Sequence, residues 1–524
     1  MLKSRLCIAF FAFAVGCAPA QKPLTDYVNP MLGTATLWDS VDLGFKPTKR
    51  TWGAEVFPGS SLPNAMVQVS PVTKFHSGAG YQYEDSVIYG FTHTNKGHWN
   101  LCHIPLLPVT GTPTPGDYCS PFSHERESAA PGYYQVFLDR YGVDAQLSST
   151  LRCAFHKYTY PAGAAASLLA DLQRSNEHVR AWDIRKEGDN VFAGWQQTGE
   201  KMYFYAVANR PVTGIEPVVE GDREVRIVRF GEGDGALELR IGFSFVSEKN
   251  ARENLEAEML GKSFAEVRSE ATATWNDLLG RIRVEGGTER EKGLFYSSLY
   301  RSFLWPALRS DVNGEFTDVD GKVINPGFRY YTGPSYWDDY RNKLILLGML
   351  APDVAADVIS SDTDKGEKRG GFMPTFFHGD HASAFVAGTY LRGNRGFDVN
   401  RAYNLVLRNA TVQGPSRPWL DEYIAKGYIS EMDVENPVTW TVCKAAVTKT
   451  LEYSYDDYAV ALLADALGDK ENRDMLMKRT SNYKNLFDPS TGLMRGRLEN
   501  SEWITPFDDQ YPYYEYICLL YTSD

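Results

Sequence analysis

Two patterns of hydrophobic and polar positions divide the chain near residue 247. Before that point, apolar and polar side chains alternate in short runs, and turns rich in Gly, Asp and Asn separate several of them. A period of two repeated in this way predicts an antiparallel β-sandwich over residues 25–247. The clearest runs are YYQVFLDR, CAFHKYTYP, VFAGWQQTG, KMYFYAVANR, EVRIVRFG and LELRIGFSFV.

After that point apolar residues recur at helical spacing. Residues 248–285 predict one or two linker helices, and residues 286–524 predict mainly helices, with no strand alternation after Val323 strong enough to indicate a second sheet. Successive helices without coiled-coil heptads favour a toroid of helical hairpins. The fold class is therefore a multidomain β and α protein. The expected helices after the linker are 289–308, 337–361, 381–392, 399–409, 442–467 and 469–486.

The stretch GPSYWDDYRNKLIL at 333–346 places an aromatic residue, two acids and a base where a loop enters a predicted helix. Ser335 can cap this helix, and the two acids fall in its first turn, where the helix dipole favours anions. An indole face stacks on a sugar ring while a carboxylate accepts hydroxyl hydrogen bonds, so Trp337 and Asp338 are candidate sugar-binding residues. In the alternative interpretation neither residue binds sugar: Trp337 is a buried core residue, and Asp338 caps the helix or compensates its dipole.

The segment GFTHTNKGHWNLCHIPLLP at 90–108 is a second candidate region, because long loops with polar and aromatic residues are often functional. Trp99 is the candidate stacking residue of this loop. His93, His98 and His103 recur every five residues, which does not match a helical pair of zinc ligands, so a zinc site is disfavoured.

Further polar clusters lie on the predicted helices. Glu452 and Asp456 are four residues apart and share a helix face, while Asp457 turns partly away. Interleaved tyrosines favour a face directed into the mouth of a barrel, with a solvated outer face as the alternative. The segment 378–381, HGDH, superficially offers metal ligands. Arg341 is expected to pair with an acid of its own helix or the next one.

Charge and composition narrow the function classes. The formal net charge of −12 over 524 residues disfavours nucleic acid and anionic membrane surfaces as partners. Aromatic residues make up 13% of the chain, a proportion typical of proteins that stack on sugars.

The N-terminus predicts an export signal. Lys3 and Arg5 precede an apolar run at 6–15, and the following AVGC resembles a bacterial lipobox ending at Cys17. Residues 1–17 are then a lipoprotein signal peptide with Cys17 as the lipid anchor, and the protein belongs to the periplasm or the surface of a bacterium. The alternative is a plain signal peptide cleaved a few residues later.

Seven segments resemble glycoside hydrolase family 92 in their order and approximate spacing. They are YVNPMLGT (27–34), FPGSSLPNAMVQVSP (57–71), YQYEDSVIYGFTHT (81–94), FYSSLYRSFLWPALRSD (295–311), YWDDYR (336–341), TLEYSYDDY (450–458) and NYKNLFDPSTGLMRGR (482–497). The resemblance implies an N-terminal antiparallel β-sandwich, linker helices and an (α/α)6 barrel. It also implies a calcium-dependent exo-α-mannosidase that inverts configuration and acts on mannosides or N-glycan mannose. The calcium ligands and the oligomeric state are not assigned.

Inverting hydrolysis needs two carboxyl groups about 6.5–9.5 Å apart, with a water between the base and the sugar. The resemblance implies a general acid at the start of a Glu-(Gly/Ala)-Asn-Ala-Trp motif and a base in a later Gly-Asn-Asp motif. Glu515 lies where the acid is expected, but the Tyr516-Ile517-Cys518 that follows departs from the motif and leaves this role in doubt. No Gly-Asn-Asp follows it.

The number of predicted helices agrees with the absence of the Gly-Asn-Asp motif. Six hairpins require twelve helices, and residues 286–524 predict about half of them. We therefore expect an incomplete (α/α)6 barrel, a fragment that lacks the catalytic base and hydrolyses no mannoside by itself. The alternatives are another (α/α)6-barrel glycosidase or phosphorylase, and a non-catalytic carbohydrate-binding protein on the same scaffold.

Overall fold

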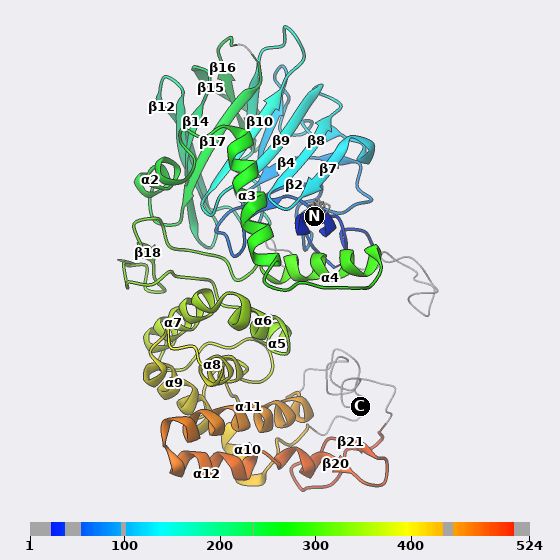
Figure 1. The fold of residues 1–524 in the computed structure, drawn as a ribbon, viewed down its shortest axis with the longest axis vertical. Helices are drawn as coiled ribbons and strands as arrows, with labels where there is room; N and C mark the ends of the chain where they lie inside the picture. Colours follow the sequence, from blue (N-terminus) through cyan, green and yellow to red (C-terminus); the bar gives the residue numbers. More distant parts are fainter. Residues whose placement is uncertain (1–21, 37–53, 96–100, 234, 433–443, 508–524) are drawn as a thin grey trace, which may run out of the picture.

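A two-sheet sandwich is followed by a helical half (Figure 1). The computed structural model describes residues 22–36, 54–95, 101–233, 235–432 and 444–507. The strands of the sandwich end at Ser244, and helix α2 begins at Glu248. The predicted order, an antiparallel β-sandwich and then helices, is confirmed.

The sandwich has a seven-stranded and an eight-stranded sheet, and every paired strand is antiparallel. The first sheet follows the order β1 (Ser60–Ser61), β2 (Gln68–Val72), β4 (Gly90–Thr92), β5 (Leu106–Val109), β11 (Ser167–Ala170), β16 (Arg223–Phe230) and β15 (Val212–Glu220). The second follows β12 (Ala181–Gly188), β13 (Val191–Gln197), β14 (Lys201–Ala208), β17 (Leu237–Ser244), β10 (Cys153–Thr159), β9 (Val143–Ser149), β8 (Tyr133–Leu138) and β7 (Glu127–Ala130).

Strand β14 illustrates why these sequences form a sandwich. Met202, Phe204 and Ala206 are buried, while the residues between them are partly exposed. Successive side chains of a strand point to opposite faces, so this alternation buries one face against the other sheet. Three two-stranded sheets complete the described strands: β3 (Val87–Ile88) with β6 (Ser120–Pro121), β18 (Phe316–Thr317) with β19 (Val323–Ile324), and β20 (Phe487–Asp488) with β21 (Leu493–Met494). The last pair lies in the helical half, where no further sheet was expected.

Helices α2 (Glu248–Glu258), α3 (Phe264–Leu279) and α4 (Glu289–Ser302) connect the two halves (Figure 1). Capping boxes start the second and third of them, at Ser263 with Glu266 and at Thr288 with Glu291. The fully buried Trp275 of α3 donates its indole N–H to the Ser61 carbonyl at 2.7 Å, which fixes this helix on the sandwich.

Gly132, in the turn between β7 and β8, lies so close to α3 that there is no room for a side chain. Its φ is +77°, and a Cβ there would lie 2.5 Å from the Cβ of Ala271. We expect Gly132→Ala to lower the free energy of unfolding by about 2–4 kcal/mol, because backbone strain and a steric clash add. Urea unfolding measures the loss. Gly163→Ala is the matched control, since Gly163 has a φ of +78° and no atom within 4 Å of its added Cβ. Equal losses in the two variants would exclude the clash.

The second half consists of short helices and one long helix. They are α5 (Tyr336–Asp339), α6 (Lys343–Leu350), α7 (Pro352–Lys368), α8 (Ala382–Leu391), α9 (Val399–Thr411), α10 (Leu420–Lys426), α11 (Ala446–Leu467) and α12 (Lys470–Arg479). The 3-10 turns are η1 (Leu24–Tyr27), η2 (His124–Arg126) and η3 (Asn482–Leu486). No single helix of the described segments is long and apolar enough to span a membrane, although α6 and α7 pass that test together, with a bend of 119° between them.

Three predicted helix boundaries are wrong. The predicted helix 337–361 is divided into α5, α6 and α7. The break before α7 has a clear cause, because Pro352 cannot continue a helix and forces Ala351 out of helical geometry, with φ −137° and ψ 63°. The predicted helix 289–308 ends at Ser302, and the predicted helix 469–486 ends at Arg479 before the turn η3.

Candidate active site

The starts of α5 and α8 and the middle of α11 converge on one site. The Trp337 ring of α5 lies 5.2 Å from the Phe377 ring, which precedes α8. Tyr340 stacks on His381, the residue before α8, at 3.8 Å between ring centroids. The imidazole of His381 in turn contacts Glu452 of α11 at 3.3 Å. Elements more than 70 residues apart in the chain are thus joined by direct side-chain contacts.

Trp337 and Asp338 lie in the first turn of α5, where the sequence places them. Asp338 is exposed, and its Oδ2 accepts a hydrogen bond from the Ser335 hydroxyl at 2.5 Å. Trp337 is half-buried, and its buried indole N–H has no hydrogen-bond acceptor within the described segments. A buried donor without an acceptor is costly, so such a group points to a ligand or water.

Ser335 does not cap the α5 backbone, so that prediction is wrong. Its hydroxyl bonds to Asp338 instead, and the buried Asp339 accepts the backbone N–H of Ser335 at 3.2 Å. Burial raises the pKa of Asp339, and Lys343 compensates its charge at 3.1 Å. The two neighbouring acids therefore differ in role: Asp339 holds the turn, and Asp338 faces solvent.

The predicted partner of Arg341 is also wrong. Its guanidinium lies 3.7 Å from Glu452 of α11, and its centre is 4.5 Å from the Tyr340 ring. Pairing with an acid of its own helix requires that helix to continue through Arg341, but α5 ends at Asp339. Arg341 therefore ties α5 to α11.

Glu452 and Asp456 share a helix face, as their spacing predicts, and both contact the imidazole of His381. The Nδ1 of His381 lies 2.9 Å from Asp456 and its Nε2 lies 3.3 Å from Glu452. Burial raises the pKa of Glu452 to about 6. Burial alone would lower the pKa of His381, but the carboxylates of Asp456 and Glu452 outweigh it and raise that pKa. The pair holds a histidine beneath Tyr340 and does not form an open ligand face.

The described residues do not identify the calcium ligands that the family resemblance implies. No group of three or more His, Cys, Asp or Glu side chains in the described segments could hold a metal ion. In the segment 378–381, Asp380 bonds to Asn409 at 2.9 Å and pairs with Arg417 at 3.3 Å. We therefore assign no calcium ligands and derive no step through the ion.

Two histidines of the loop 90–108, His93 and His103, are core residues. His93 Nε2 lies 3.0 Å from His156 Nε2, and His103 bonds to the hydroxyls of Thr94 and Thr198 at 2.9 Å each. Burial lowers the pKa of His93 to about 3 and that of His103 to about 4, so both are neutral. The other candidate residues of this stretch and of the chain ends, which are Trp99, His98, Cys17 and Glu515, lie outside the described residues.

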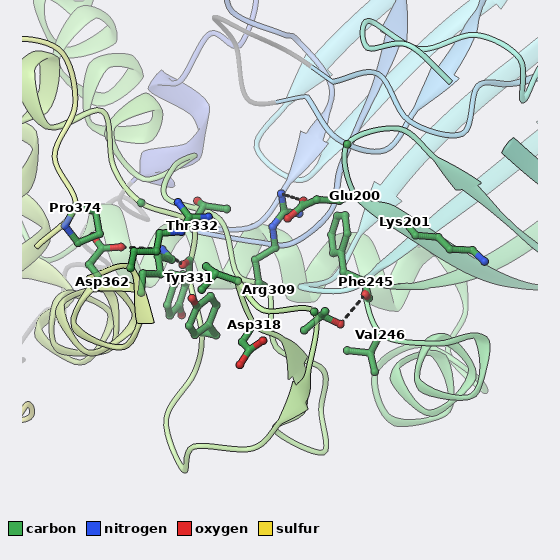
Figure 2. Close-up of a pocket in the computed structure, with 18 of the residues that line it drawn as sticks. Glu200, Lys201, Phe245, Val246, Arg309, Asp318, Tyr331, Thr332, Asp362 and Pro374 are labelled. Atoms are coloured by element: carbon green, nitrogen blue, oxygen red, sulfur yellow. Dashed lines mark hydrogen bonds and ion pairs between the residues drawn. The ribbon is translucent and has the colours of Figure 1, made fainter. Parts of the chain in front are cut away.

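A pocket of about 950 Å³ between the sandwich and the helical half borders this site (Figure 2). Glu200, Lys201 and Phe245 come from the sandwich side, and Tyr331 and Asp362 from the helical side. Sequence reasoning missed this pocket, because its walls come from segments that are far apart in the chain. The lining aromatic residue Phe376 immediately precedes Phe377, the ring that contacts Trp337.

Comparisons with solved structures agree with this arrangement. The family 92 α-mannosidase BT3965 of Bacteroides thetaiotaomicron superposes with a TM-score of 0.82 and 27% identity, over 93% of this chain and 68% of that one. The family 92 inverting mannosidase BT2199 of Bacteroides thetaiotaomicron VPI-5482 gives a TM-score of 0.81 at 24% identity, over 94% of this chain and 69% of the other, which shows the shared fold.

Comparisons of sequence agree as well. An uncharacterized secreted glycosidase of Arthroderma benhamiae is 24% identical over 522 residues, covering 88% of this chain, and the chain spans 62% of the length of that relative. The profile of the glycosyl hydrolase family 92 N-terminal domain matches residues 27–253, and that of the family 92 catalytic domain matches residues 250–522. Together the two matches extend over nearly the whole chain. The chain therefore belongs to glycosyl hydrolase family 92.

Proposed function

We propose that this protein is of the exo-α-mannosidase type and recognises terminal α-linked mannose of mannosides or N-glycans, and that Trp337 and Asp338 hold the terminal sugar. BT3965, a relative of similar fold that is 27% identical to this chain, is named an α-mannosidase and was solved in complex with mannoimidazole. Inversion of configuration, a calcium requirement and a lipid anchor at Cys17 belong to the same proposal and come from the resemblance. Export is supported by the relative described as secreted.

The proposal rests on two neighbouring groups: the indole N–H of Trp337, which has no acceptor among the described residues, and the exposed carboxylate of Asp338. The indole supplies a donor and an apolar face, and the carboxylate supplies acceptors for two hydroxyl groups. Ser335 and Arg341 orient the two residues through hydrogen bonds to the Asp338 carboxylate and the Trp337 carbonyl. A hexose presents the complementary set, with hydroxyls at its edge and C–H groups on its face.

Only one of the two groups that would transfer protons is assigned. Glu515 is the proposed general acid, and no residue of this sequence is assigned as the base. An inverting site also needs the acid kept protonated near neutral pH, which a buried carboxyl achieves through a raised pKa. Sugar recognition and bond cleavage are therefore separate parts of the proposal and need separate measurements.

Calorimetric titration with methyl α-D-mannoside and its C2 epimer, methyl α-D-glucoside, tests the recognition step. We expect the mannoside to bind at least about tenfold more tightly, because a site that hydrogen-bonds a hydroxyl rejects the analogue that misplaces it. Equal affinities, or no binding in the presence of calcium, would contradict the proposal.

An aryl α-mannoside assay with and without a chelator then separates a calcium-dependent hydrolase from a calcium-independent enzyme and from a binding protein.

A further inference from the structure

We propose that Phe376, Phe377 and the adjoining interdomain pocket bind the second and third sugars of a manno-oligosaccharide whose terminal ring lies at Trp337. This inference rests on the proposed function and extends it from a single sugar to an oligosaccharide. It assigns substrate binding to the boundary between the sandwich and the helical half.

An aromatic strip leads from the terminal-sugar site to the pocket. The rings of Trp337 and Phe377 are 5.2 Å apart, and those of Phe377 and Phe376 are 5.8 Å apart and stacked at 24°. Phe376 and Phe377 are each 45% exposed, although Phe is among the residue types most often buried. Exposed aromatic faces in a row suit the C–H faces of successive sugar rings.

The backbone of Phe377 supports a functional reading of this exposure. Its φ is +66°, in the left-handed region that bulky side chains rarely adopt. A strained residue persists where the surrounding structure holds it, and such residues concentrate at ligand-binding and active sites. The conformation sets the Phe377 ring between Trp337 and Phe376.

The pocket beyond Phe376 offers donors and acceptors whose charges compensate one another (Figure 2). Arg309 pairs with Glu200 at 3.1 Å, and Lys365 pairs with Asp362 at 2.7 Å. A pocket of about 950 Å³ lies within the range of about 300–1,000 Å³ common for ligand sites. The lining as a whole holds four basic and three acidic side chains, so it is close to neutral and offers hydrogen-bonding groups of both kinds to a ligand with many hydroxyl groups.

Tyr330 supplies an independent sign of a ligand. It lines the pocket and is only 5% exposed, and its buried hydroxyl has no hydrogen-bond partner in the described part of the chain. Its ring is fixed by stacking on Phe316 at 3.6 Å. Because the Tyr330 ring is already held in place, its hydroxyl can form a hydrogen bond to a ligand without further loss of side-chain conformational entropy.

Calorimetric titration of the full chain with methyl α-D-mannoside and with α-linked mannotriose tests the inference. We expect mannotriose to bind about tenfold more tightly than the monosaccharide, and Phe376→Ala to remove about fivefold of that gain. Tyr330→Phe, which keeps the stacked ring, should weaken mannotriose by about threefold. Neither variant should change the affinity for methyl α-D-mannoside.

Phe487→Ala is the matched control, because Phe487 has a similar exposure of 42% and lies on β20 (Figure 1). It should leave both affinities unchanged. Equal binding of mannotriose and methyl α-D-mannoside, or no effect of both pocket variants on mannotriose, would overturn the inference while the proposed function stands. Failure of the wild-type protein to bind either sugar would overturn both.

Discussion

Replacing Asp457 with asparagine is expected to lower the free energy of unfolding by about 3–5 kcal/mol, because it leaves buried positive charge uncompensated. Asp457 is fully buried on α11 and pairs with Arg417 at 2.6 Å and with Arg479 at 2.9 Å. Arg417 is itself fully buried and Arg479 is 8% exposed. Asparagine keeps the shape of the side chain, so the loss reports the charge and its hydrogen bonds. Urea unfolding measures it.

Asp465→Asn is the control on the same two helices. Asp465 of α11 pairs with Arg473 of α12 at 2.8 Å, but their side chains are 56% and 31% exposed. An exposed ion pair contributes only about 0–1 kcal/mol, because water and salt screen it. If Asp457→Asn cost no more than Asp465→Asn, the buried cluster would not hold α11 to its neighbours.

Acidification from pH 7.5 to pH 5 is expected to destabilise the β-sandwich by about 2 kcal/mol for each of three buried histidines. Burial lowers the pKa of His93 to about 3 and of His103 to about 4, and it lowers that of His156 well below its usual value. The unfolded chain binds these protons below pH 6.5, while the folded sandwich excludes them. Stability is therefore present above that pH and is lost as the pH falls.

Hydrogen exchange of sandwich peptides, corrected for the intrinsic effect of pH, measures this loss. Peptides around α11 are an internal reference, because burial raises the pKa of Glu452 and of Asp380 to about 6. Those carboxyls bind protons more tightly in the folded state, so their contribution to stability grows between pH 7.5 and pH 5. Equal protection of β10 peptides at both pH values would show that the three histidines do not remain neutral in the folded protein.

Local sequence rules were sufficient for the architecture. The alternation seen in β14 depends only on the period of a strand, and the capping boxes at Ser263 and Thr288 mark helix starts within four residues. The first-turn position of Trp337 and Asp338 also follows from nearby residues, because Gly333 and Pro334 end the preceding segment. Each of these features is determined over a few positions.

Contacts between distant segments could not be predicted in this way. Arg417 lies in the loop sequence GPSRPWL, where nothing indicates a fully buried guanidinium, and its partner Asp457 is 40 residues away. Arg341 was expected to pair with an acid of its own helix or the next one, because the sequence does not show that α5 ends at Asp339. The interdomain pocket was missed for the same reason. Its lining residues, such as Glu200 and Lys365, come together around one pocket only after both halves have folded.

The central claim is that the exposed carboxylate of Asp338, beside Trp337, holds a terminal mannose. Calorimetric titration of methyl α-D-mannoside into the wild-type protein, Asp338→Asn and Asp421→Asn tests it most directly. Asp421 is the control, because it is an exposed acid in the first turn of α10. We expect Asp338→Asn to weaken binding by about 10- to 100-fold, the loss of hydrogen bonds to a charged group, and Asp421→Asn to leave it unchanged. Wild-type affinity in Asp338→Asn would contradict the claim.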